Sequence, residues 1–123
     1  MITKIRKRDG REVPFNVEKI ANAIFKAAQS VGGNNYEESL ELAYQVCTYL
    51  EEQYKNEVPT VEQVQDVVER VLIERGFVRS AKSYILYRAE RSRVRARFLV
   101  MVKIQAIGLP IGIYRWAAQR ILR

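Results

Sequence analysis

Three stretches of the chain repeat apolar residues every three or four positions, and each follows a residue that caps helices well. This spacing places the apolar side chains along one face of an α-helix. An Asn or Thr just before the stretch can accept a hydrogen bond from an N–H group of the first turn. The faces are Val17, Ile20, Ala23, Ile24, Ala27 and Val31 after Asn16; Leu40, Ala43, Tyr44, Cys47 and Leu50 after Asn35; and Val61, Val64, Val67, Val68, Val71 and Leu72 after Thr60. A helical core is therefore expected.

Breaks in this pattern give the expected bounds of the elements. Gly32-Gly33 ends the first helix, Gly76 ends the third, and the second runs to about Tyr54. A fourth helix is expected from about Ser80 through Arg97 or beyond. Before the helices, residues 2–8, the turn at 9–10 and residues 13–15 form a predicted β-hairpin. Residues 57–59 are a candidate third strand, so the fold class is α+β and mostly helical.

Composition excludes several classes of function. The chain has 123 residues, no His and one Cys. Histidine-based catalysis, an intrachain disulfide and a cysteine-rich zinc site are therefore excluded. The first residues lack the apolar segment of a signal peptide, and a lone thiol fits a reducing compartment, so a cytoplasmic location is expected. A binding protein, rather than an enzyme, is the expected class.

Basic residues are concentrated at the end of the chain. Residues 1–93 hold 15 Lys and Arg against 14 Asp and Glu, whereas residues 94–123 hold six basic residues and no acidic one. We expect a domain over residues 1–94 and a basic, apolar, helical extension over 95–123. Its apolar run at 104–114 is too short for a bilayer, which needs roughly 20 residues. Packing on its own domain or a partner is favoured over nucleic acid or a membrane surface.

The predicted hairpin and the helix after it favour an anionic ligand. Lys7 and Arg8 would stand beside the helix N-terminus at Asn16, whose N–H groups favour an anion. Lys19 lies one turn into that helix. Three cations at one place suit a polyphosphate. The alternative is a solvated hairpin edge with no ligand.

The predicted fourth helix carries two aromatic and two basic residues on one face. Tyr84, Tyr87, Arg88 and Arg91 are spaced i, i+3, i+4 and i+7. Aromatic rings and guanidinium groups together suit a nucleotide. Alternatively, Tyr84 and its neighbour Ile85 pack inward while the arginines pair with acids such as Glu90. No Walker-type loop or Asp-rich magnesium site is present in the sequence, so ATP hydrolysis is not supported.

Five short motifs, in this order and spacing, resemble the ATP-cone, a regulatory domain of ribonucleotide reductases and of the repressor of reductase genes. They are Lys-Arg-Asp-Gly at 7–10, Val-Pro-Phe-Asn at 13–16, Glu-Lys-Ile at 18–20, Pro-Thr-Val-Glu at 59–62 and Tyr-x-x-Tyr-Arg at 84–88. The resemblance covers residues 3 to about 93. It implies a four-helix bundle capped by a three-stranded mixed sheet. It also implies binding of ATP or dATP with Mg²⁺, without chemistry, and a response through a homo-oligomer or a reductase-type partner.

The same resemblance assigns site residues. Lys7, Arg8, Lys19, Thr60 and Arg91 are implied phosphate contacts, and Tyr87 packs on the base. The nucleotide-contacting segment would comprise Val13, Pro14, Phe15, Asn16, Val17, Glu18 and Lys19, with Asn16 facing the base. The chain departs from the family's pattern at two positions. Val13 stands where some members have a Glu that contacts the adenine amino group, and the family's His near the start of the third helix is missing, with Gln65 as the nearest polar substitute.

A nucleic-acid-binding regulator is the alternative function. It would use Arg6, Lys7 and Arg8 with the basic residues after 94. The nearly neutral charge of residues 1–93 weighs against it, because a nucleic-acid-binding domain usually carries an extended basic surface.

Overall fold

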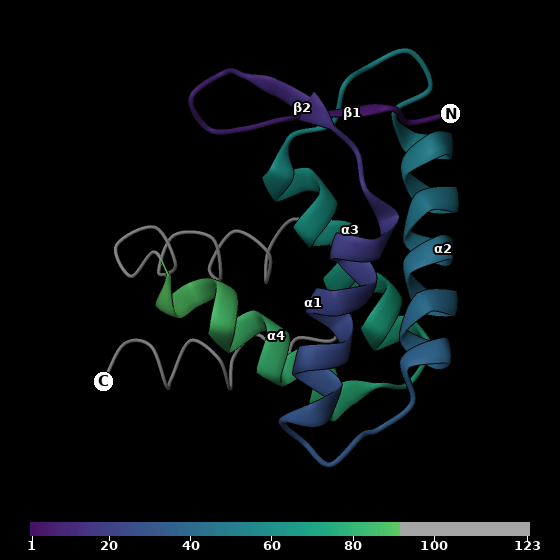
Figure 1. Ribbon diagram of the computed structural model, residues 1–123, viewed down its shortest axis with the longest axis vertical. Helices are drawn as coiled ribbons and strands as arrows, with labels where there is room; N and C mark the ends of the chain where they lie inside the picture. Colours follow the sequence, from purple (N-terminus) through teal and green to yellow (C-terminus); the bar gives the residue numbers. More distant parts are fainter. Residues whose placement is uncertain (92–123) are drawn as a thin grey trace.

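A computed structural model describes residues 1–91, and they form a hairpin followed by four helices (Figure 1). The elements are β1 (Lys4–Arg6), β2 (Glu12–Pro14), α1 (Val17–Gln29), α2 (Tyr36–Gln53), α3 (Val61–Glu74) and α4 (Val78–Glu90). The helix type and approximate bounds predicted for α1, α2 and α3 are confirmed. The predicted continuation of α4 to Arg97 and the predicted extension over 95–123 lie outside the described residues.

The predicted cap residues begin α1, α2 and α3. Asn16 Oδ1 accepts from the backbone N–H of Glu18 at 2.9 Å, and Asn35 Oδ1 accepts from that of Glu38 at 3.1 Å. Thr60 and Gln63 exchange two such bonds, at 3.1 and 2.9 Å, which is a complete capping box. The start of α4 has no side-chain cap, and it lies two residues before the predicted Ser80. Apolar packing therefore fixes this helix more than its own first turn does.

The four helices pack in a ring, with α1 and α3 each lying against both α2 and α4. The predicted four-helix bundle is thus confirmed. Its core includes buried residues from every helix: Ala21, Ile24 and Ala27; Leu42, Ala43, Val46 and Leu50; Val64, Val67, Val68, Val71, Leu72 and Ile73; and Ala81, Tyr84 and Ile85. A carboxylate, that of Glu69, is also buried at the edge of this core.

The hairpin crosses one end of the bundle (Figure 1). Ile5 pairs with Val13 in an antiparallel register, and Gly10 takes a φ of +89° in the turn. Ile5 and Phe15 pack against the core, which seats the hairpin over the beginnings of α1 and α3.

The prediction of a three-stranded sheet is wrong for residues 1–91, where the sheet has two strands. In place of a third strand, residues 57–60 contribute a single parallel bridge between Arg6 and Thr60. The backbone N–H of Arg6 donates to the carbonyl of Pro59 at 2.9 Å. The strand pairing ends at this bridge because Pro59 has no N–H to donate and Thr60 is already the N-cap residue of α3. This bridge nevertheless fixes the hairpin beside the first turn of α3.

Candidate functional site

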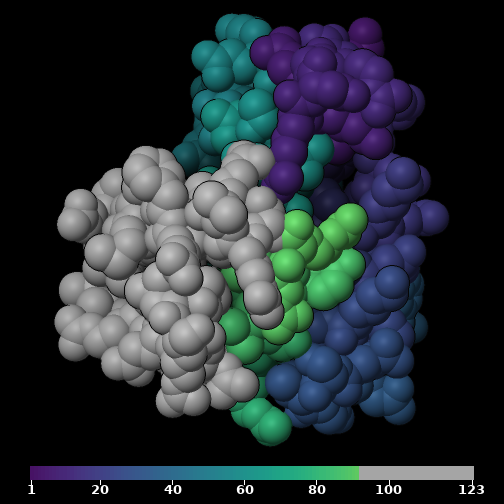
Figure 2. Space-filling view, turned by 90° about the vertical axis from the view of Figure 1, so that its left-hand side faces the viewer, coloured from purple at the N-terminus to yellow at the C-terminus, as the bar shows by residue number. Residues whose placement is uncertain are grey.

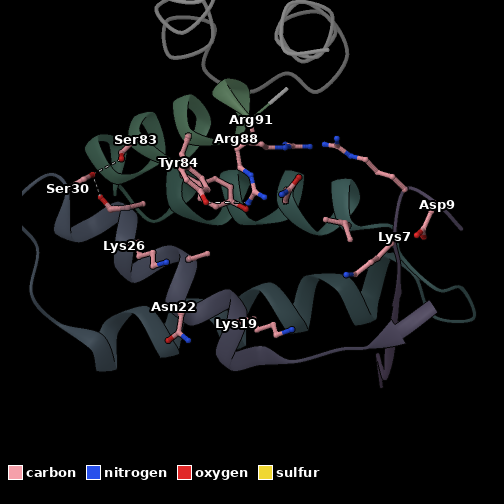
Figure 3. A pocket seen from close by; sticks show the side chains of 16 residues that line it. Lys7, Asp9, Lys19, Asn22, Lys26, Ser30, Ser83, Tyr84, Arg88 and Arg91 are labelled. Carbon is pink, nitrogen blue, oxygen red and sulfur yellow. Dashed lines mark hydrogen bonds between the residues drawn. The ribbon is translucent and has the colours of Figure 1, made fainter. Parts of the chain in front are cut away.

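A cavity of about 800 Å³ lies between the hairpin turn, α1 and α4, and α3 contributes to its wall. On the face shown in Figure 2, the surface is hollowed between the hairpin and α4. Figure 3 shows side chains entering this space from the hairpin, α1 and α4. The lining residues are Lys7, Arg8, Asp9, Lys19, Asn22, Ala23, Lys26, Ala27, Ser30, Val61, Gln65, Ser83, Tyr84, Tyr87, Arg88 and Arg91.

Four exposed basic side chains stand around the rim of this cavity. Lys7 comes from the hairpin, Lys19 and Lys26 come from α1, and Arg91 follows α4. We call these four residues the rim cations. Within residues 1–91 none of them forms an ion pair, although they point into one space (Figure 3). Four cations from three separate elements give the cavity a positive potential that favours an anion.

The arginines of the hairpin, unlike Lys7, form ion pairs with nearby carboxylates. Arg8 Nε lies 3.1 Å from Glu62 Oε1, at the first turn of α3. Arg11 Nε lies 2.7 Å from Asp9 Oδ2. Hydrogen bonds from the backbone N–H and the side chain of Arg11 lower the pKa of Asp9. Of the hairpin's basic residues that line the cavity, Lys7 forms no ion pair within residues 1–91, whereas a phosphate at Arg8 would compete with Glu62.

The predicted face of α4 does point to the cavity, but its two arginines have different surroundings. Arg88 has only 8% of its side chain exposed and donates to Asp66 at 2.8 Å and to Glu69 at 3.0 Å. Burial disfavours the charge of Arg88, but the two carboxylates outweigh it and raise the pKa. The prediction that these arginines pair with acids such as Glu90 is wrong about the partners: the acids of Arg88 lie on α3.

The tyrosines on this face differ in the same way. Tyr84 is buried, and burial raises the pKa of its phenol. The expectation that Tyr84 and Ile85 pack inward is thus confirmed. Tyr87, in contrast, is 56% exposed, and the guanidinium of Arg91 lies 5.8 Å from the centroid of its ring. Tyr87 and Arg91 form an aromatic and cationic pair on the open side of the cavity.

The structure gathers five of the predicted site residues around the cavity: Lys7, Arg8, Lys19, Tyr87 and Arg91. The other seven lie outside its lining: Val13, Pro14, Phe15, Asn16, Val17, Glu18 and Thr60. Val13 and Pro14 pair within the hairpin, and Phe15 and Val17 pack against the core. The side chains of Asn16 and Thr60 accept the capping bonds of α1 and α3. Their roles toward a ligand stay predictions.

Several lining residues were not predicted from the sequence. Asn22, Lys26 and Ser30 continue the line of Lys19 along α1, at steps of three or four residues. That polar stripe is the signal that would have identified them. The hydroxyl of Tyr36 donates to Asn22 Oδ1 at 3.1 Å, and the hydroxyls of Ser30 and Ser83 share a hydrogen bond of 2.6 Å. These bonds fix one end and one side of the cavity.

Within residues 1–91, no group of three or more Asp, Glu, Cys or His side chains is placed to hold a metal ion. None of the helices in this part of the chain is both long and apolar enough to cross a membrane. The charged side chains that line the cavity are mostly basic, which favours an anionic ligand.

Comparison with known proteins identifies the family. The profile of the ATP cone domain matches residues 3–93. The chain is 43% identical over 100 residues to the vitamin B12-dependent ribonucleoside-diphosphate reductase of Thermoplasma acidophilum, covering 77% of this chain and 13% of that protein. It is 33% identical over 102 residues to the ribonucleoside-diphosphate reductase subunit alpha of Chlamydia pneumoniae, covering 77% and 10%.

A third relative, the anaerobic ribonucleoside-triphosphate reductase of Escherichia coli, is 32% identical over 91 residues, covering 74% of this chain and 12% of that protein. The chain thus spans about an eighth of these relatives or less, and the shared part is the nucleotide-binding domain rather than a whole reductase. These matches support the regulatory function and not the nucleic-acid alternative. The chain belongs to the ATP-cone family.

Proposed function

We propose that this chain binds an adenine nucleotide, ATP or dATP, in the cavity between the hairpin, α1 and α4, and acts through that binding without chemistry of its own. One observation carries the proposal. The rim cations converge from three elements without an ion pair within residues 1–91, beside the exposed ring of Tyr87. A triphosphate supplies the missing negative charge, and the ring provides a face for a base.

The distribution of charge orients the nucleotide. Lys7 and Lys19 lie at the hairpin end of the cavity, where their charges attract the triphosphate (Figure 3). Ala23 and Ala27 line the wall on α1, and their small side chains leave room for a flat ring opposite α4. Mg²⁺ would enter bound to the phosphate oxygens of the nucleotide.

Regulation requires that the nucleotide bind two states of the protein unequally, since a ligand shifts an equilibrium only by that difference. We place this equilibrium in assembly, either of copies of this chain or with a reductase-type partner. Residues 1–94 would form the nucleotide-binding unit and 95–123 the contact. Truncation after Arg97 should then preserve nucleotide affinity and abolish assembly in sedimentation experiments. Unchanged assembly would exclude that role for the extension.

Calorimetric titration of the chain with ATP, dATP and GTP in the presence of Mg²⁺ tests nucleotide binding. The double variant Lys7→Ala/Lys19→Ala should lose about a hundredfold or more in affinity for ATP, since each lysine makes a charge-assisted contact to phosphate. Lys4→Ala is the matched control, because Lys4 is an exposed hairpin lysine that does not line the cavity. Equal losses in both variants, or no heat with any nucleotide, would contradict the proposal.

A further inference from the structure

One polar group in the wall of the cavity has no hydrogen-bond partner among residues 1–91. Gln65 lies on α3 and lines the cavity, and its Oε1 is buried with no hydrogen-bond donor reaching it from residues 1–91. The polar groups around it are satisfied differently. Arg88 donates to Asp66 and Glu69, and Asn22 Oδ1 accepts from Tyr36. A buried acceptor without a donor costs free energy, which a donating ligand would recover.

The chemistry of a nucleotide limits which part can meet Gln65. The phosphate oxygens of a nucleotide at neutral pH accept hydrogen bonds, so the donor must come from the base or the ribose. Gln65 lies four residues after Val61, which is roughly 6 Å further along the helix from the hairpin end. The bridge from Arg6 to Thr60 marks that end, and Lys7 follows in the same hairpin. Gln65 is therefore placed beyond the triphosphate.

Three other residues that line the cavity favour the base over the ribose as the group that meets Gln65. Ala23, Ala27 and Tyr84 contribute apolar surface to the same cavity. A flat purine ring can pack against such a surface, whereas ribose hydroxyls there would need further polar partners.

We infer, on the basis of the proposed function, that Gln65 reads the base and selects adenine. Its Oε1 accepts from the 6-amino group and its Nε2 donates to N7, the pairing that glutamine makes with adenine. Guanine and hypoxanthine carry a carbonyl at that position, so two acceptors would face each other. Asn16, which the sequence favoured for the base, is occupied as the cap of α1 and lies outside the lining.

Titration of the whole chain with ATP, dATP and inosine triphosphate tests this assignment. The wild type should bind ATP about tenfold more tightly than inosine triphosphate, because a bidentate amide discriminates between bases by about that much. In Gln65→Met, which keeps the volume and removes the amide, the ratio should fall to about one through weaker binding of ATP. Gln45→Met is the control, since Gln45 lies on α2 outside the cavity and should keep the wild-type ratio.

The outcomes separate this inference from the proposed function. If the wild type binds none of the three nucleotides, both fail. If it binds ATP but also binds inosine triphosphate equally well, or if Gln65→Met keeps the wild-type ratio, only the role of Gln65 is overturned. If Gln65→Met weakens ATP but leaves dATP unchanged, Oε1 contacts the ribose 2′-hydroxyl instead, which also overturns it. The wild-type ratio is informative even if the variant does not fold.

Discussion

Arg88 and Arg91 lie one turn apart beside the same cavity, yet they belong to two different regions of the molecule. Arg88 lies in the wall, where it is buried and bound to Asp66 and Glu69 of α3. Arg91 lies on the rim, where its guanidinium contacts the hydroxyl and the ring of Tyr87. Arg88 has its countercharge within the fold, whereas Arg91 forms no ion pair within residues 1–91.

On the proposed function, this difference separates the residues that stabilise the fold from those that bind the ligand. A buried charge must be paired, because desolvation is costly, and it then fixes the packing of α3 against α4. The rim cations remain hydrated and repel one another weakly, so they contribute little to folding. The two regions should therefore respond to the same kind of substitution in opposite ways.

The largest effect is expected at the wall. Arg88→Met should destabilise the protein by about 3–5 kcal/mol, because it removes the guanidinium that pairs with the carboxylate of Glu69, which is only 1% exposed. Urea unfolding followed by circular dichroism measures this loss. The free energy of unfolding of Arg91→Met should lie within about 0.5 kcal/mol of the wild-type value. A loss at Arg88 no larger than that at Arg91 would remove the distinction between the regions.

On the rim, substitution should affect binding and not folding. Arg91→Ala should weaken ATP binding by about tenfold or more, through the loss of a charge-assisted contact. Calorimetric titration measures it, and Arg75→Ala is the control, since Arg75 is exposed at the end of α3 and does not line the cavity. Unchanged affinity in Arg91→Ala would place the phosphates away from α4 and restrict the site to the hairpin and α1.

A smaller effect on binding should come from a residue that only positions another. Tyr36→Phe removes the hydrogen bond to Asn22 Oδ1 but keeps the ring, whose centroid lies 5.4 Å from that of Phe25. Asn22 then loses its fixed orientation, and ATP affinity should fall by about fivefold, the equivalent of one hydrogen bond. Tyr44→Phe is the matched control, because Tyr44 is exposed on α2 away from the cavity. Equal affinities in the two variants would exclude a positioning role for the hydrogen bond between Tyr36 and Asn22.

The two regions also differ in how far the sequence predicts them. The caps at Asn16, Asn35 and Thr60 and the shared face of Tyr84, Tyr87, Arg88 and Arg91 follow from neighbours within one or two turns, and the structure contains them. The partners of Arg88 cannot be predicted from such local patterns, because Asp66 and Glu69 lie 22 and 19 residues away on another helix. The prediction of a third strand was wrong for a reason that is visible in the sequence, because Pro59 cannot donate the hydrogen bond that would extend the strand pairing. The buried Oε1 of Gln65, which has no hydrogen-bond donor within residues 1–91, can be identified only once the hairpin, α1, α3 and α4 are packed together.

The smallest effect is expected at an ion pair that is exposed rather than buried. Glu74 accepts hydrogen bonds from Arg70 Nε and from the hydroxyl of Tyr49, both at 2.8 Å, and these bonds lower its pKa. A folded-state pKa below the unfolded value stabilises the protein above the unfolded pKa, and this contribution is lost as the pH falls through the folded pKa. Both charged side chains are more than a third exposed, so the contribution at neutral pH should be only about 0.5 kcal/mol. Glu74→Gln should therefore unfold slightly more easily than the wild type at about pH 7, and the difference should be smaller at about pH 3, because the contribution is lost as the pH falls toward the folded-state pKa. A loss at Glu74 as large as that at Arg88 would mean that burial is not what separates the wall from the surface, and urea unfolding at both pH values decides it.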